Sequence, residues 1–136
     1  MKMKLNSVLL IDDNAATNLV HRKVLTKLGC AENIFVCKSG EEALNFLTSL
    51  SNSEAEDKQP QLVFLDINMP GMSGWDFMKE YERLPQETKG DVVIMMLTTS
   101  LNPDDKDRAD QFHSISGFLN KPLSTSKLEQ VLQQHF

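Results

Sequence analysis

Short apolar runs alternate along the chain with segments in which apolar residues recur at helical spacing. The candidate strands are 8–11, 34–37, 62–65, 92–97 and 118–119. Three of them are continuous apolar runs, which is typical of parallel strands that are covered on both faces. The pattern therefore predicts a sheet with a layer of structure on each side.

Each candidate strand is followed by a segment with helix signals. Leu19, Val20, Val24, Leu25 and Leu28 form an apolar face in the first of these segments, and Gly29 ends it. The later helices are expected from a capping box at 39–42, over 73–84, from a start signal at 102–105 with Asn102 as the cap, and over about 124–134. A strand followed by a helix five times predicts an α/β fold with a parallel sheet and helices on both faces.

Composition narrows the class of protein. With 136 residues, of which 40% are hydrophobic and 24% charged, we expect one ordinary domain spanning 1–136, with a polar loop at 51–61. The net charge of −5 and the lack of a basic stretch indicate no nucleic-acid partner, and no apolar run reaches the ~20 residues of a membrane span. Without a targeting segment we expect the cytoplasm, where Cys30 and Cys37 would be reduced core residues.

Polar residues follow four of the five strands. In a parallel sheet, ligands bind outside the carboxyl ends of the strands. The residues at these ends are Asp12 and Asp13 after the first strand, Asp66 after the third, Thr98, Thr99 and Ser100 after the fourth, and Asn120, Lys121 and Pro122 after the fifth. Each of these residues also has a structural explanation by itself. Asp12, Asp13 or Asn14 can cap a helix, and Asp66 can form a turn. Thr98 suits a strand, and Lys121 can lie at the surface. Together they favour a functional site.

Three neighbouring carboxylates repel one another and must bind a cation or take up protons. Oxygen ligands with open coordination positions suit Mg²⁺ and a phosphate-bearing partner. Thr98 can donate a hydrogen bond to a phosphoryl oxygen, Lys121 can offset its charge, and Asp66 can act as the nucleophile that forms an aspartyl phosphate. No glycine-rich phosphate loop is present, so nucleotide binding is not supported.

Four segments, LLIDDN, FLDINMPGMSGWDF, MMLTTS and GFLNKP, resemble the receiver domains of two-component response regulators in their order and near their spacing. The resemblance runs from residue 7 to about 134. It implies a single receiver domain with the flavodoxin-like, CheY-like fold, a doubly wound five-stranded parallel sheet of strand order 2-1-3-4-5.

The resemblance also implies a role for each residue of the acidic cluster. Asp66 looks like the phosphoacceptor and Asp13 like a Mg²⁺ ligand, with Asp12 holding the metal through water. The backbone carbonyl of Asn68 is similar to the family's third protein ligand.

Further roles are implied for residues of the last two strands. Thr98 looks like the hydroxyl that follows the phosphoryl group, and Lys121 like the lysine that pairs with phosphate. Phe118 sits where the family has an aromatic residue that moves inward on activation, and the Lys121–Pro122 bond is expected to be cis. Thr99 departs from the small residue common at its position, so we expect it to narrow access to the acyl phosphate and to slow both phosphorylation and hydrolysis.

A member of this family is a signalling phosphoacceptor that assists its own phosphotransfer and autodephosphorylation, and is not a conventional enzyme. The resemblance implies a sensor histidine kinase or a histidine phosphotransfer protein as phosphodonor. The output partner, which the sequence does not identify, would read the face formed by the helix from Asn102, the strand at 118–119 and the helix at 124–134. The expected oligomeric state is a monomer or a weak dimer linked to phosphorylation.

Two other classes are weighed beside the receiver. A Mg²⁺-dependent phosphohydrolase with an aspartyl-phosphate intermediate typically needs a second acid two residues past its nucleophile, where this chain has Asn14 or Asn68. A receiver-like binding module that no longer takes phosphate usually lacks one of the acids or the lysine, and all are retained here. The three histidines, His21, His113 and His135, have no ligand spacing and are expected at the surface or at its boundary.

Overall fold

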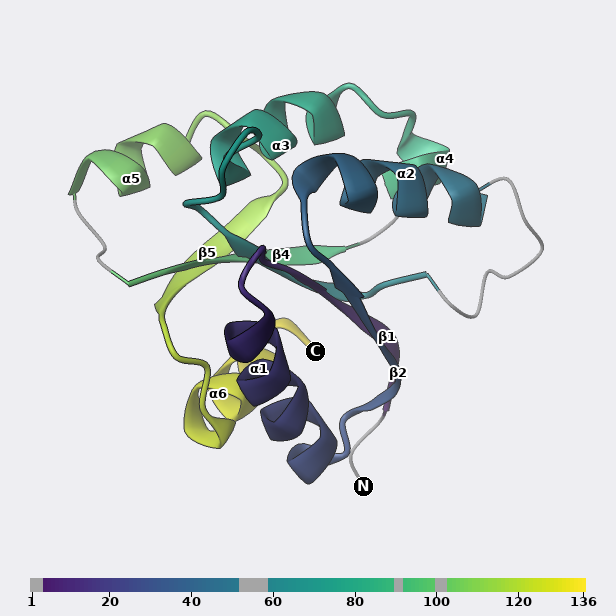
Figure 1. Ribbon diagram of the computed structural model, residues 1–136, viewed down its shortest axis with the longest axis vertical. Coiled ribbons are helices and arrows are strands. Elements are labelled where there is room, and N and C mark those ends of the chain that lie inside the picture. Colours follow the sequence, from purple (N-terminus) through teal and green to yellow (C-terminus); the bar gives the residue numbers. More distant parts are fainter. Residues whose placement is uncertain (1–3, 52–58, 90–91, 100–102) are drawn as a thin grey trace.

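Five parallel strands form a single sheet in the computed structural model, with helices on both of its faces (Figure 1). The structure describes residues 4–51, 59–89, 92–99 and 103–136. The strands are β1 (Leu5–Ile11), β2 (Ala31–Cys37), β3 (Leu62–Asp66), β4 (Val93–Thr98) and β5 (Ile115–Asn120). They lie in the order β2-β1-β3-β4-β5, and all four neighbouring pairs are parallel. The α/β class and the strand order 2-1-3-4-5 are confirmed.

The helices form two layers. They are α1 (Ala15–Leu28), α2 (Gly40–Ser51), α3 (Gly74–Glu82), α4 (Gln86–Lys89), α5 (Pro103–Ala109) and α6 (Thr125–His135). Figure 1 shows α1 and α6 on one face of the sheet and α2, α3 and α5 on the other. The five predicted helices are present, although the predicted cap Asn102 lies outside the described residues. The four-residue helix α4 was not predicted, because one turn carries no periodic signal.

Alternate side chains of the central strands supply two apolar cores, one on each face of the sheet. The core beneath α2 and α3 takes Leu9, Ile11, Val63, Leu65, Ile94 and Met96 from the strands. The core beneath α1 and α6 takes Val8, Leu10, Leu62, Phe64, Met95 and Leu97. Burying one such side chain fully contributes about 1.5–3 kcal/mol, so these two cores hold the sheet edge rigidly in place.

The edge strands β2 and β5 are longer than their apolar runs indicated. Most residues of β5 are only partly buried, and Ser116 and Gly117 interrupt its apolar pattern. The central strand β3, by contrast, is buried at all five positions, and its predicted extent differs by a single residue. The central strand β1 is also longer than its predicted run of 8–11, so apolar runs locate every strand of this sheet but underestimate the length of β1 and of both edge strands.

The buried face of α1 differs from its predicted apolar face. Leu19 and Val20 are 55% and 47% exposed. The buried positions are Asn18, His21 and Leu25, which recur at helical spacing. The prediction that His21 lies at the surface or its boundary was therefore wrong, since His21 is 1% exposed.

Other local predictions hold. Gly29 ends α1 with a left-handed φ of 64°, a conformation that glycine adopts without steric penalty. Cys30 and Cys37 are both buried, as expected of core residues. The Lys121–Pro122 peptide bond is cis. Within the described segments, none of the helices combines the length and apolar character that crossing a membrane requires.

Candidate functional site

Three carboxylates meet at the carboxyl edge of the sheet because β1 and β3 are paired in register. Ile11 lies opposite Leu65 in the parallel ladder, so the residues that follow them become neighbours. Asp12, Asp13 and Asp66 each place one carboxylate oxygen within 4.8 Å of the others. Asp12 and Asp66 are buried, and Asp13 is exposed. The three acids predicted for this edge are therefore brought together.

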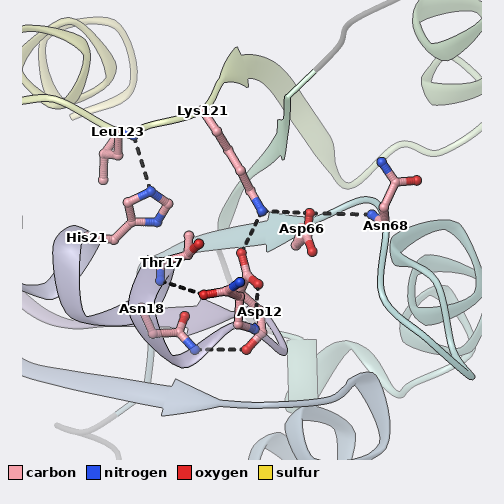
Figure 2. Close-up of polar contacts among 9 residues, drawn as sticks. Asp12, Thr17, Asn18, His21, Asp66, Asn68, Lys121 and Leu123 are labelled. Carbon is pink, nitrogen blue, oxygen red and sulfur yellow. Dashed lines mark hydrogen bonds and ion pairs between the residues drawn. The ribbon is translucent and has the colours of Figure 1, made fainter.

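Lys121 joins the two buried acids. Its Nζ lies 2.7 Å from Asp12 Oδ2 and 2.9 Å from Asp66 Oδ1, as Figure 2 shows. Burial alone would lower the pKa of the Lys121 ammonium, but its bonds to Asp12 and Asp66 outweigh burial and hold that pKa above its ordinary value. Lys121 is thus a charged and largely buried residue of the site, and the surface alternative is excluded.

Asp66 is placed by the rigid end of β3 and by the turn that follows. The backbone N–H of Asn68 donates to Asp66 Oδ1 over 3.4 Å, and the N–H of Gly74 donates to the carbonyl of Ile67 over 2.8 Å. Burial raises the pKa of the Asp66 carboxyl, and this effect outweighs the opposing bond to Lys121. A carboxyl with a raised pKa in a cluster of acids is typical of functional sites.

The start of α1 settles which residue caps that helix. Asn14 is the N-cap, and its side-chain oxygen accepts a hydrogen bond from the N–H of Thr17 over 2.9 Å. Asp12 Oδ1 accepts from the N–H of Asn14, also over 2.9 Å. The carboxylate of Asp13 remains exposed beside Asp12. Because Asn14 satisfies the helix end, capping does not explain the two aspartates.

A polar cavity of about 400 Å³ lies beside the turn that follows Asp66 and is bordered by Thr98, the last residue of β4. Its lining consists of Ile67, Asn68, Ser73, Trp75, Thr98, Asp105 and Arg108. Thr98 is buried, its carbonyl accepts a hydrogen bond from the N–H of Lys121 over 2.8 Å, and Thr99 is exposed. Ser100, the third member of the predicted hydroxyl group, lies outside the described residues.

Phe118 lies apart from the acidic cluster. It is half-buried in β5, and its ring tilts at 57° against Trp75 with the ring centroids 6.3 Å apart. Trp75 also stacks on Phe112, and the guanidinium of Arg108 lies 5.0 Å from its ring centroid. An aromatic group therefore connects the cavity beside Asp66 to β5.

Sequence reasoning missed two residues that support the site, Asn18 and His21. Asn18 Nδ2 donates to the carbonyl oxygen of Asp12 over 2.8 Å, and His21 Nε2 accepts from the N–H of Leu123 over 3.2 Å. The signal that could have found them is their spacing with Leu25, which places all three on one helix face.

The chemistry of the cluster fits Mg²⁺. The ligands on offer are carboxylate oxygens, which are hard donors, and the exposure of Asp13 leaves one side open to solvent. Neither cysteine belongs to the cluster, so nothing in it favours a softer metal.

Comparisons with known proteins agree with this geometry. The family model for the response regulator receiver domain matches residues 8–133. The chain is 27% identical over 126 residues to the response regulator Rcp1 of Synechocystis, a match that covers 93% of this chain and 83% of that protein. A two-component response regulator from Cytophaga hutchinsonii superposes with a TM-score of 0.86 at 29% identity, covering 96% of both chains. The chemotaxis protein CheY4 of Vibrio cholerae gives a TM-score of 0.75 at 25% identity, covering 98% of this chain and 99% of that one.

Proposed function

Because the chain belongs to the response regulator receiver domain family, we propose that it is a phosphorylation-dependent signalling switch with Asp66 as the phosphoacceptor. Receiver domains are signalling phosphoacceptors that take phosphoryl groups from histidine kinases or phosphotransfer proteins. The observation that carries the proposal is the Lys121 ammonium held between Asp12 and Asp66. From this place the Lys121 ammonium can contact a phosphoryl group on Asp66 and still remain paired with Asp12.

The acidic cluster would hold Mg²⁺. In this proposal Asp13, Asp66 and the backbone carbonyl of Asn68 are direct ligands, and Asp12 contributes through water. When bound, the ion offsets the repulsion among the carboxylates and stabilises the negative charge of the transferred group. The close approach of the three carboxylates and the position of Asn68 beside Asp66 support this ligand set.

Phosphotransfer needs one nucleophile and one mobile cation from the protein. An oxygen of Asp66 attacks the phosphorus of a phosphohistidine, the P–N bond breaks, and its electron pair goes to the imidazole of the donor. Lys121 exchanges its contact with Asp66 for one with a phosphoryl oxygen and offsets the charge that develops there. Attack of water on the acyl phosphate reverses the switch, giving inorganic phosphate and the Asp66 carboxylate. The protein thus assists both steps without being a conventional enzyme.

The phosphoryl group would act on a two-state element that includes Thr98 and Phe118. The Thr98 hydroxyl moves towards the phosphoryl oxygens, and Phe118 moves inward to fill the space that Thr98 leaves. The face formed by α5, β5 and α6 then differs between the two states. The contact of Phe118 with Trp75, whose ring lines the cavity beside Asp66, supports this coupling.

The partners follow from the same proposal. The phosphodonor is a sensor histidine kinase or a histidine phosphotransfer protein in the cytoplasm, and an output protein reads the face of α5, β5 and α6. A phosphohydrolase is disfavoured because Asn14 and Asn68 stand where a second acid would be needed.

Intact-mass spectrometry after treatment with acetyl phosphate and Mg²⁺ tests the proposal. We expect the added mass of one phosphoryl group in the wild type and none in Asp66→Asn. No adduct in the wild type, or one that survives Asp66→Asn, would overturn it.

A further inference from the structure

His21 is a buried titratable residue that the proposed phosphotransfer does not use. It lies in the middle of α1, 1% exposed, and its ring points towards the segment between β5 and α6 (Figure 2). Its Nε2 accepts a hydrogen bond from the N–H of Leu123 over 3.2 Å. Burial lowers the pKa of the imidazole, nearby Lys121 lowers it further, and Asp12 opposes them with a smaller effect. Because Nε2 accepts this hydrogen bond it carries no proton, so the geometry indicates a neutral ring with its hydrogen on Nδ1.

The bond to His21 reaches the segment that carries Lys121. Leu123 follows Lys121 by two residues and is itself buried. A lysine side chain has a long flexible stem, so the position of its ammonium depends on how firmly its backbone is held. A buried N–H of Leu123 without an acceptor would be unfavourable, which gives the segment a strong preference for the place where His21 meets it.

The same helix also holds the opposite partner of the ion pair. Asn18 lies three residues before His21 on the same face of α1 and donates to the carbonyl oxygen of Asp12 over 2.8 Å. Asp12 in turn contacts Lys121 Nζ over 2.7 Å. One helix therefore contacts the backbone of Asp12 and the backbone of Leu123, two residues past Lys121, as Figure 2 shows.

Two further residues form hydrogen bonds with the Lys121 segment, Lys127 from α6 and Thr98 from β4. Lys127 Nζ donates to the carbonyls of Asn120 and Pro122 over 2.8 and 3.1 Å. The N–H of Lys121 donates to the carbonyl of Thr98. His21 differs from them because it ties this segment to an element 102 residues away in sequence, through a buried bond.

We propose that His21 is a positioning residue that holds Lys121 between Asp12 and Asp66. The inference rests on the proposed function, since it assigns to Lys121 its part in phosphotransfer. The proposal predicts that loosening Lys121 slows phosphorylation but does not weaken Mg²⁺ binding. A loosened Lys121 stabilises the transferring phosphoryl group less well, so phosphorylation slows. A loosened Lys121 also competes less for the carboxylates, so Mg²⁺ binds as tightly as before or more tightly.

The test compares His21→Leu, which removes the acceptor, with His21→Gln, which offers an amide oxygen in its place. In His21→Leu we expect phosphorylation by acetyl phosphate about tenfold slower, with a Mg²⁺ Kd equal to or below that of the wild type. In His21→Gln we expect a rate within about threefold of the wild type, because the acceptor is retained. The Mg²⁺ titration uses the fluorescence of Trp75.

A matched variant separates positioning from general destabilisation. Leu25→Val removes buried volume four residues later on the same helix and leaves the hydrogen bond between His21 and Leu123 in place. Its thermal unfolding is measured beside that of both His21 variants. An unchanged rate in His21→Leu, a parallel loss of Mg²⁺ affinity, or an equal slowing in Leu25→Val at matched stability would overturn the proposal.

A measurement on the wild-type protein tests the role of His21 even if a variant fails to fold. Proton–nitrogen correlation spectra of the His21 ring should show the neutral tautomer with hydrogen on Nδ1, and hydrogen on Nε2 would overturn the proposal. If the wild type takes up no phosphoryl group, the proposed function fails, while the tautomer and the Mg²⁺ affinities still decide the role of His21.

Discussion

A Cβ atom placed on Gly74 would lie 2.6 Å from the carbonyl oxygen of Asp66 and 2.9 Å from the Cα of Ile67. Both neighbours are backbone atoms at the end of β3, and neither can move without moving Asp66. The N–H of Gly74 also donates a hydrogen bond to the carbonyl of Ile67. The first residue of α3 therefore rests directly against the backbone that carries the proposed phosphoacceptor.

We expect Gly74→Ala to lower the free energy of unfolding by about 1–3 kcal/mol, because the added methyl group overpacks a rigid contact. It should also weaken Mg²⁺ binding, because Asp66 must shift with the strand end. Urea unfolding and a Mg²⁺ titration measure the two effects.

Gly117→Ala is the control for this substitution. A Cβ at Gly117 would meet only the end of the Met95 side chain, at 3.0 Å, and a flexible thioether can turn away. A Gly74→Ala protein that matches Gly117→Ala in stability and in Mg²⁺ affinity would contradict the close contact at Asp66.

Mg²⁺ should stabilise the folded protein through the acidic cluster. A ligand at 100 times its Kd that binds only the folded state raises the free energy of unfolding by about 2.7 kcal/mol. We expect an increase of this size in urea unfolding, reversed by EDTA. Asp13→Asn should remove most of it while leaving the core unchanged, because Asp13 is exposed. The same stabilisation in the wild type and in Asp13→Asn would place the metal elsewhere.

The raised pKa of Asp66 predicts how stability depends on pH when metal is absent. The folded-state pKa lies above the unfolded-state pKa because burial disfavours the charged carboxylate. As the pH rises through the interval between these two values, the unfolded state loses its proton first, so the free energy of unfolding falls. In Asp66→Asn the free energy of unfolding should no longer fall over this pH interval. The variant should therefore be more stable than the wild type at neutral pH in EDTA.

Asp76 provides a control of opposite sign. In the capping box of α3, the N–H of Ser73 donates to Asp76 Oδ2 over 3.1 Å, and this bond together with the Ser73 side chain lowers the pKa of the Asp76 carboxyl. Asp76→Asn should therefore be less stable than the wild type above the unfolded-state pKa. Urea unfolding from pH 3 to pH 8 compares the two variants, and a destabilised Asp66→Asn protein would show that the Asp66 charge is favourable in the folded state.

The extra methyl and hydroxyl of Thr99 should slow the phosphorylation cycle. Thr99 is exposed and directly follows Thr98, which lines the cavity beside Asp66. We expect Thr99→Ala to take up a phosphoryl group from acetyl phosphate faster and to lose it faster than the wild type. Stopped-flow fluorescence of Trp75 follows both rates. Equal rates in the two proteins would exclude a role for Thr99 in access.

The site was largely predictable because its acids and its lysine each follow an apolar run. Asp12, Asp66 and Lys121 needed only the rule that parallel strands end at one edge. The supporting contacts of α1 were not predictable in this way. Leu19 and Val20 were predicted to be buried because they are apolar, yet the face of α1 towards the site carries Asn18 and His21. Hydrogen bonds to the backbone of Asp12 and Leu123 make their burial possible, and Leu123 is 102 residues away from His21 in sequence. The helical spacing of Asn18, His21 and Leu25 can indicate a shared face, but it does not reveal which residues that face contacts.

The central claim is that Asp66 carries the phosphoryl group, and one site-resolved measurement tests it directly. The protein is incubated with acetyl phosphate and Mg²⁺, the acyl phosphate is reduced with borohydride, and the peptides are sequenced by tandem mass spectrometry. Reduction of an aspartyl phosphate converts that aspartate to homoserine, so the modified residue is identified by its position. We predict homoserine at position 66, and only when Mg²⁺ is present. Homoserine at position 12 or 13, or at no position in a protein that binds Mg²⁺, would contradict the account.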